Sequence, residues 1–186
     1  MPAKRRSFVA VVKAAERALS AAGIGHVFVG ALAVAAFGVP RTTTDVDVIV
    51  DYREADVSKM AEAFRRQDFR VGEEDLRDAR AERSHCTVHD MLSQFRIDLA
   101  PATRPAAKDA IRRSVRVRWQ GTILPIADPE HTIVMKLAYG SDQDVEDALG
   151  ILVRQKGRLD RRRMRDFARK QGVLGALEAL ERKAVA

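Results

Sequence analysis

The segment from Asp45 to Val50 constrains the fold of this chain most, because it alternates carboxylate and branched apolar residues before becoming fully apolar. Side chains two residues apart on a β-strand point to the same face of the sheet. Asp45 and Asp47 therefore project together, while Val46 and Val48 pack behind them. The pattern predicts a central strand over 45–50 with one buried face.

Two carboxylates on one face of a buried sheet repel each other, and they are costly unless a cation neutralises them. Asp98 is the odd polar residue in a second apolar segment, 95–99, and beside the first strand it would complete a cluster of three. Mg²⁺ is a hard cation held by carboxylates and substrate phosphates, so Asp45, Asp47 and Asp98 are candidate ligands for Mg²⁺ or Mn²⁺. Solvated aspartates at strand ends are the alternative interpretation.

Hydrophobic spacing elsewhere predicts a mixture of helices and strands. We expect helices over 5–22, 31–37, 55–68 and 106–113, strands over 26–29, 86–89 and 94–99, and a hairpin over 115–126. The polar, charged segment 72–83 predicts an exposed loop or mobile flap.

The C-terminal part carries helix start signals. Asp128 followed by Pro129 is typical of a helix N-terminus, and Ser141 with Asp144 resembles a capping box. Two more helices are expected, one after Asp160 and one over 173–180. We therefore predict an α+β fold: a core over 1–127 with a short mixed sheet flanked by helices, and a helical part over 128–186 packed on it as a single folded unit.

Composition limits the classes of protein. A single cysteine excludes a disulfide framework, and the longest apolar stretch, 27–39, is too short to cross a bilayer, so we expect a cytoplasmic protein with no membrane partner. Lys and Arg number 33 against 26 Asp and Glu, a formal net charge of +7. The excess positive charge, which gathers in basic clusters, suits RNA or nucleotide phosphates as partners, although such clusters are more often a solvated surface.

Gly30 and Ala31 stand where the strand over 26–29 turns into the next helix. Small residues there let backbone N–H groups and the positive helix end approach a phosphate, although close packing explains such a pair equally well. No GxxxxGK[ST] segment is present, which excludes a P-loop NTPase.

Together these residues resemble the nucleotidyltransferase superfamily typified by DNA polymerase beta. That family has a glycine followed by a small residue, a helix, a strand with two aspartates in a DxD pattern, and a third aspartate on a later strand. Gly30-Ala31, Asp45, Asp47 and Asp98 match it in order. Ala31 departs from the usual Ser or Gly, which removes a hydroxyl that would bind a phosphate oxygen. The resemblance implies a nucleotidyltransferase fold.

The segments 30–47 and 128–147 look like a bacterial subgroup of small stand-alone nucleotidyltransferases, which includes the abortive-infection (AbiEii-like) toxins of type IV toxin–antitoxin systems. In those toxins a lysine and an aspartate face the nucleotide, and Lys136 and Asp147 are the matching residues. From the residues alone, Lys136 would neutralise triphosphate charge and Asp147 would orient it or an accepting hydroxyl. A salt bridge from Lys136 to Asp144 or Asp147 is an equally good explanation.

Arg41, Thr43 and Thr44 precede the carboxylate strand, so they are candidates to reach phosphates, and a role in forming the turn is equally compatible. The resemblance implies a metal-dependent transfer of a nucleoside monophosphate from an NTP to a hydroxyl, with release of pyrophosphate. Asp98 would help to deprotonate the acceptor, which would be a tRNA, another RNA or a protein. The toxin resemblance also implies a cognate antitoxin as a partner.

Two other functions remain open. A transferase acting on a small molecule such as an aminoglycoside would need an acidic acceptor pocket, whereas the net charge here is positive. A non-catalytic module on the same fold would bind RNA or a partner protein, but nothing structural demands three clustered carboxylates.

Overall fold

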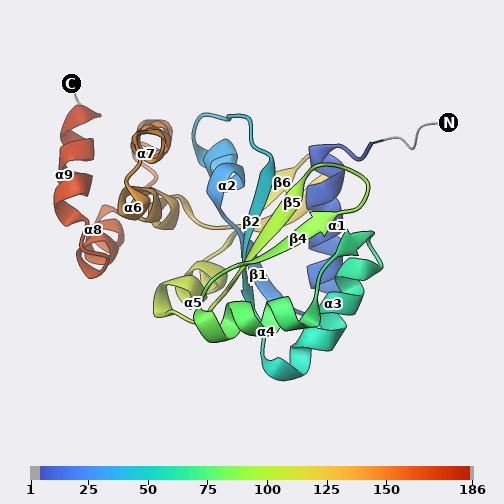
Figure 1. The fold of residues 1–186 in the computed structure, drawn as a ribbon. Helices are drawn as coiled ribbons and strands as arrows, with labels where there is room; N and C mark the ends of the chain where they lie inside the picture. The colour runs from blue at the N-terminus through green and yellow to red at the C-terminus, as the bar shows by residue number, and fades with distance from the viewer. Residues whose placement is uncertain (1–4, 185–186) are drawn as a thin grey trace.

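The computed structural model describes residues 5–184, in which helices flank a mixed seven-stranded sheet (Figure 1). The first half contains α1 (Phe8–Ala21), β1 (Gly25–Phe28), α2 (Gly30–Phe37), β2 (Asp45–Asp51), the 3₁₀ helix η1 (Glu54–Asp56), α3 (Val57–Arg65), β3 (Phe69–Arg70), α4 (Glu73–Glu82) and β4 (Cys86–Asp90). The second half contains β5 (Arg96–Pro101), α5 (Pro105–Arg112), β6 (Val115–Trp119), β7 (Thr122–Ile126), α6 (Pro129–Tyr139), α7 (Asp142–Arg154), α8 (Arg161–Lys170) and α9 (Leu174–Lys183). The α+β class predicted from the sequence is confirmed.

The sheet has the strand order β3-β4-β5-β2-β1-β7-β6, so β2 lies at its centre. β2 pairs in parallel with β5 and antiparallel with β1. The predicted hairpin is confirmed: β6 and β7 pair antiparallel, and Gln120 and Gly121 both have positive φ at its turn. The central position of β2 agrees with the position predicted from its apolar residues.

The two faces of the sheet are covered unequally. Val46, Val48 and Val50 point into the main core, which α1 and α3 cover. The opposite face carries Asp45 and Asp47, which are only half-buried, and a small cluster built around α5 covers just part of it. The uncovered part of that face is available for a ligand.

The four C-terminal helices pack together beside α2 (Figure 1). The Asp128 carboxylate accepts a hydrogen bond from the backbone N–H of His131, which confirms the predicted cap of α6. The Ser141–Asp144 capping box opens α7 as predicted, and Asp160 caps α8. Val34 of α2 belongs to the same apolar cluster as α6 to α9, so α2 connects this helical part to the sheet.

The loop predicted over 72–83 is wrong, because the structure forms helix α4 there. Acidic residues occupy the first turn of α4, where they stabilise the positive end of the helix dipole. Leu76 and Ala79 are buried three residues apart, and the remaining residues are mostly strong helix formers. An exposed helix with so few apolar residues has the polar composition of a loop.

Smaller differences concern the ends of elements. The helix predicted over 55–68 is split into η1 and α3, and α3 ends at Arg65, before a turn in which Asp68 is left-handed with φ of 60°. The two-residue strand β3 was not predicted. Among residues 5–184, no helix is long and apolar enough to cross a bilayer.

Gly38 fixes how closely the end of α2 approaches α7. A Cβ atom at Gly38 would lie 2.7 Å from Cγ1 of Ile151 and 3.1 Å from the Val34 carbonyl oxygen. We expect Gly38→Ala to lower the free energy of unfolding by about 1–3 kcal/mol, because α2 and α7 must move apart. Urea denaturation measures this change.

Gly175→Ala is the matched control, since a Cβ at this exposed helical position meets nothing within 4 Å. It should raise the free energy of unfolding by up to about 0.5–1 kcal/mol through better helix propensity. Equal effects of the two substitutions would contradict the close packing of α2 on α7.

Candidate active site

The register between β2 and β5 brings the predicted carboxylates together. Asp47 lies directly opposite Asp98, and Asp45 lies opposite Arg96. Residues two apart on a strand share a face, so all three carboxylates project from the partly uncovered face of the sheet. The parallel pairing of two strands that are far apart in the sequence therefore builds the cluster.

The three carboxylates differ in their hydrogen bonds. Asp98 Oδ1 accepts a hydrogen bond from Thr87 Oγ1 at 2.7 Å, and Asp45 Oδ2 accepts one from Arg96 Nη2 at 2.9 Å. Within the described part of the chain, the Asp47 carboxylate accepts no hydrogen bond from a side chain or backbone group and forms no ion pair. Asp47 is thus a half-buried carboxylate without a direct positive partner.

The environment of Asp47 opposes its negative charge. Burial raises the pKa of Asp47, and the neighbouring carboxylates of Asp98 and Asp45 raise it further. Lys136 and Arg41 act in the opposite direction but do not compensate. A cation bound at this carboxylate would remove both the desolvation cost and the repulsion.

Gly30, the first residue of α2, lies against the Asp47 carboxylate. Its φ is +58°, a conformation that favours glycine, and a Cβ atom there would lie 2.0 Å from Asp47 Oδ2. The close packing that is one explanation of Gly30 is therefore present, against a carboxylate of the cluster, and it leaves no room for a side chain.

We expect Gly30→Ala to destabilise the protein by about 1–3 kcal/mol through backbone strain, and to displace the Asp47 carboxylate. Gly23→Ala is the matched control, because Gly23 has a similar φ of +63° but a Cβ there meets nothing within 4 Å. Urea denaturation of both variants separates strain from the contact with Asp47. A loss no greater for Gly30→Ala than for Gly23→Ala would contradict the contact.

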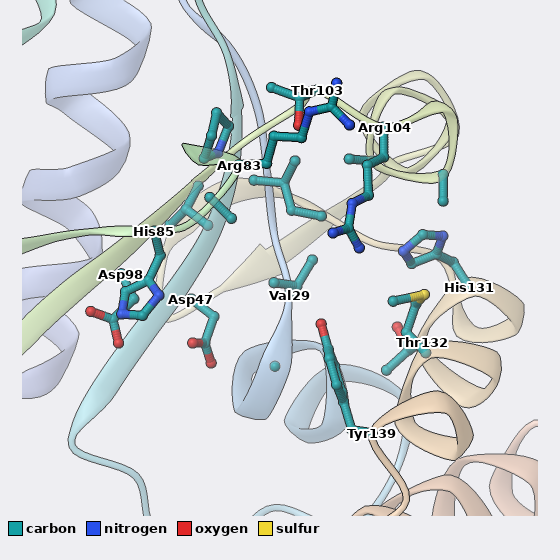
Figure 2. Close-up of a pocket in the computed structure, with 18 of the residues that line it drawn as sticks. Val29, Asp47, Arg83, His85, Asp98, Thr103, Arg104, His131, Thr132 and Tyr139 are labelled. Atoms are coloured by element: carbon teal, nitrogen blue, oxygen red, sulfur yellow. The ribbon is translucent and has the colours of Figure 1, made fainter. Parts of the chain in front are cut away.

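A cavity of about 560 Å³ lies above this face of the sheet and is lined by Gly30, Asp47, Asp98 and Lys136 among other residues. Figure 2 shows the two carboxylates on one side of it and His131 and Thr132 of α6 on the opposite side. Four of the predicted site residues, drawn from α2, β2, β5 and α6, therefore meet in one cavity.

Lys136 is buried and forms the centre of an ion-pair network. Its Nζ lies 2.7 Å from Asp144 Oδ1 and 2.9 Å from Asp147 Oδ2. Burial disfavours its charge, but the hydrogen bonds that Lys136 donates to these two carboxylates outweigh burial and raise the pKa of Lys136. The salt bridge considered from the sequence is thus present, and the same lysine also lines the cavity.

Asp147 holds two cations at once, because Arg41 Nε also lies 3.2 Å from Asp147 Oδ2. It is almost fully buried and is not among the described residues that line the cavity. Asp147 therefore positions Lys136 and does not itself face the cavity.

The other predicted residues lie outside the cavity lining. Thr43 Oγ1 bonds to the backbone of Asp45, and Thr44 Oγ1 donates to the Asp45 carboxylate at 3.0 Å, so both threonines form the turn before β2. Among residues 5–184, Ala31 and Asp45 are likewise not part of the cavity lining. The structure therefore separates an inner pair, Asp47 and Asp98, from Asp45 at the rim.

Several cavity residues were missed from the sequence. Arg83 and Arg104 line the cavity, and their side chains form no ion pair or hydrogen bond within the described ranges. Tyr139 is largely exposed, and Figure 2 shows its hydroxyl directed into the cavity. His131 stacks on Phe167 with ring centroids 5.1 Å apart, and burial lowers the pKa of His131. Only the tertiary arrangement brings these residues together.

The basic cluster over 161–165 is largely neutralised by ion pairs. Arg163 pairs with Asp128 and Glu130, and Arg165 pairs with two glutamates of α9. Arg116 and Arg118 of β6 are exposed. Arg83 and Arg104, which form no ion pair within the described ranges, therefore support an anionic ligand more strongly than this cluster does.

In the described part of the chain, no three His, Cys, Asp or Glu side chains are arranged as a ready-made metal site. The donor set nevertheless fits a hard divalent cation, because Asp47 offers two free carboxylate oxygens and Asp98 lies directly opposite.

No family model matches this chain, and the search of the curated proteins finds no match.

Proposed function

We propose that this protein is a metal-dependent nucleotidyltransferase, which transfers a nucleoside monophosphate from an NTP to a hydroxyl group. The observation that carries this proposal is the Asp47 carboxylate, which has no ion-pair partner within residues 5–184, lies opposite Asp98 on the neighbouring parallel strand and lines one cavity with Lys136. The resemblance of the sequence to the polymerase-beta superfamily, in the order of Gly30, Asp45, Asp47 and Asp98, supports the same assignment.

The residues suit the separate parts of an NTP. Asp47, Asp98 and Asp45 would hold Mg²⁺ or Mn²⁺. The ion would neutralise negative charge on the triphosphate and stabilise the charge that develops on the leaving oxygen. The backbone of Gly30 at the start of α2 and the Lys136 ammonium would bind phosphate oxygens. Asp147 would hold Lys136 in place, and Arg41 would in turn hold Asp147.

The proposed reaction is an in-line displacement. The acceptor hydroxyl oxygen forms a bond to the α-phosphorus, and the bond from that phosphorus to the oxygen bridging the α- and β-phosphates breaks, so that pyrophosphate leaves. Asp98 would accept the hydroxyl proton and pass it to solvent, a role that needs a carboxylate within reach of the attacking oxygen. Correct placement and charge stabilisation would supply most of the rate enhancement.

An RNA acceptor, such as a tRNA, is favoured over a protein by the two cavity arginines, Arg83 and Arg104, because unpaired guanidinium groups bind phosphates well. By the same resemblance, the proposed biological role is that of the toxin of a toxin–antitoxin pair, with a cognate antitoxin as its protein partner.

One observation favours a second candidate, a transferase acting on a small cationic molecule. A second cavity of about 520 Å³ is lined by Asp75, Asp78 and Glu82, and it shares Ser84 and His85 with the first. Such a wall is the acidic acceptor pocket that an aminoglycoside-like substrate would need. The two candidates use the same nucleotide site and differ only in the acceptor.

A thermal-shift measurement with Mg²⁺ and each NTP tests nucleotide binding. Ligand that binds the native state stabilises it by RT ln(1 + [L]/Kd), which is about 2.7 kcal/mol at a hundredfold excess over Kd. We expect one NTP to raise the melting temperature by several degrees in the presence of Mg²⁺ but not of EDTA. The absence of a shift with every NTP would contradict the proposal.

A further inference from the structure

Arg96 occupies a position between two of the carboxylates. It lies two residues before Asp98 on β5 and directly opposite Asp45 on β2, so it shares their face of the sheet. Its Nη2 lies 2.9 Å from Asp45 Oδ2, and its Nε lies 3.8 Å from Asp98 Oδ2. One guanidinium group therefore bridges the rim carboxylate and the inner one.

The bridge involves the oxygens that a metal ion would need. Asp98 Oδ1 is bonded to Thr87, and Asp45 Oδ1 is bonded to Thr44. The remaining oxygen of each carboxylate, Oδ2, is the one that faces Arg96. A cation that joined these carboxylates to Asp47 would have to displace the guanidinium, because two positive charges repel each other at one carboxylate oxygen.

We infer that Arg96 is a built-in competitor for the catalytic metal ion: its guanidinium holds the place of the cation between Asp45 and Asp98, and the ion binds by displacing it. The inference rests on the proposed function and adds a residue that sets the metal affinity of the site.

The competition is expected to be moderate. The Arg96 side chain is 50% exposed, so it can move into solvent, and ion pairs of this exposure shift equilibria by less than about tenfold. When only a fraction of the protein is competent to bind, the apparent dissociation constant equals the intrinsic one divided by that fraction. Removing the guanidinium should therefore tighten metal binding by roughly three- to tenfold.

The test is titration of the whole protein with Mn²⁺ alone, with free Mn²⁺ measured by electron paramagnetic resonance in the absence of nucleotide. The variant is Arg96→Met, which has no charge and no hydrogen-bond donor. Arg104→Met is the matched control, because it removes an equal charge from an arginine that lines the cavity and has no ion pair within residues 5–184. Urea denaturation verifies that both variants fold, and Arg96→Lys replaces Arg96→Met if the latter does not.

We expect Arg96→Met to bind Mn²⁺ about three- to tenfold more tightly than the unmodified protein, and Arg104→Met to change affinity by less than about twofold. Arg96→Lys, which loses the planar group that spans both carboxylates, should bind at least about twofold more tightly. Equal affinities of the unmodified protein and the Arg96 variant, or an equal gain in the Arg104 control, would overturn the inference and leave the proposed function intact. Failure of every protein to bind Mn²⁺ at millimolar concentration would instead reject the metal site itself, and the inference with it.

Discussion

Replacing Asp47 with Asn should abolish nucleotidyl transfer and, at the same time, stabilise the metal-free protein. Asn keeps the shape of the side chain but removes the charge that would bind the cation, so we expect transfer to fall by at least about a thousandfold. The charge of Asp47 is opposed by burial and by its carboxylate neighbours, so its removal should raise the free energy of unfolding by about 0.5–2 kcal/mol without metal. Activity assays and urea denaturation measure the two effects.

The stability gain should depend on pH in a definite direction. Because the pKa of Asp47 is raised in the folded state, the folded protein binds this proton more tightly than the unfolded chain does. Ionised Asp47 therefore destabilises the fold fully above its folded-state pKa and not at all below the ordinary aspartate value of 3.8. The difference in stability between Asp47→Asn and the unmodified protein should be largest near neutral pH and should close as pH falls toward 4.

Asp51→Asn is the control for this prediction, since Asp51 is an exposed residue at the other end of the same strand. It should change neither transfer nor stability appreciably. A destabilised Asp47→Asn protein, or a stability difference that grows as pH falls, would contradict the description of Asp47 as an uncompensated carboxylate.

Replacing Lys136 with Met should have the largest effect on stability. Lys136 is only 7% exposed and neutralises Asp144 and Asp147, so its loss leaves the almost fully buried Asp147 with Arg41 as its remaining cation. Breaking a buried ion pair by removing one partner costs about 3–5 kcal/mol, and we expect the lower end because Arg41 remains. Nucleotide binding should weaken as well, because the cavity loses its ammonium group. Urea denaturation and the NTP-dependent thermal shift measure these losses.

Lys108→Met is the matched control, because Lys108 is exposed on α5 and forms no ion pair in the described part of the chain. Its effect should stay within about 0.5 kcal/mol. An intermediate loss is expected for Asp144→Asn, since Lys136 then still pairs with Asp147. A Lys136→Met protein as stable as the Lys108→Met control would show that the network contributes nothing.

The sequence predicted the parts of this molecule that depend on local patterns. The alternation at Asp45–Val50 predicted both the central strand and the common face of Asp45 and Asp47, because the side-chain period of a strand is fixed. The caps of α6 and α7 were found because each requires particular residues at fixed spacing. α4 was missed because a solvated helix with two buried residues has the composition of a loop.

The cavity wall depends on contacts that no local pattern contains. Arg83 follows α4, Arg104 precedes α5 and Tyr139 ends α6, so only the tertiary arrangement brings these residues together. Arg96 was within reach of sequence reasoning, since a residue two positions before Asp98 on a strand must share its face. The register that sets Arg96 opposite Asp45 appears only once β2 and β5 are paired.

The most direct test of the proposed activity is transfer of label from each α-labelled NTP, with Mg²⁺ or Mn²⁺, to total RNA, to tRNA, to the protein itself and to an aminoglycoside. We expect label on one acceptor from one NTP, lost in Asp47→Asn and retained in Asp51→Asn. Label on tRNA or RNA would identify a nucleic-acid acceptor, and label on the aminoglycoside would favour the small-molecule enzyme. No label on any acceptor, or transfer that persists in Asp47→Asn, would contradict a nucleotidyltransferase built on these carboxylates and favour a non-catalytic binding module.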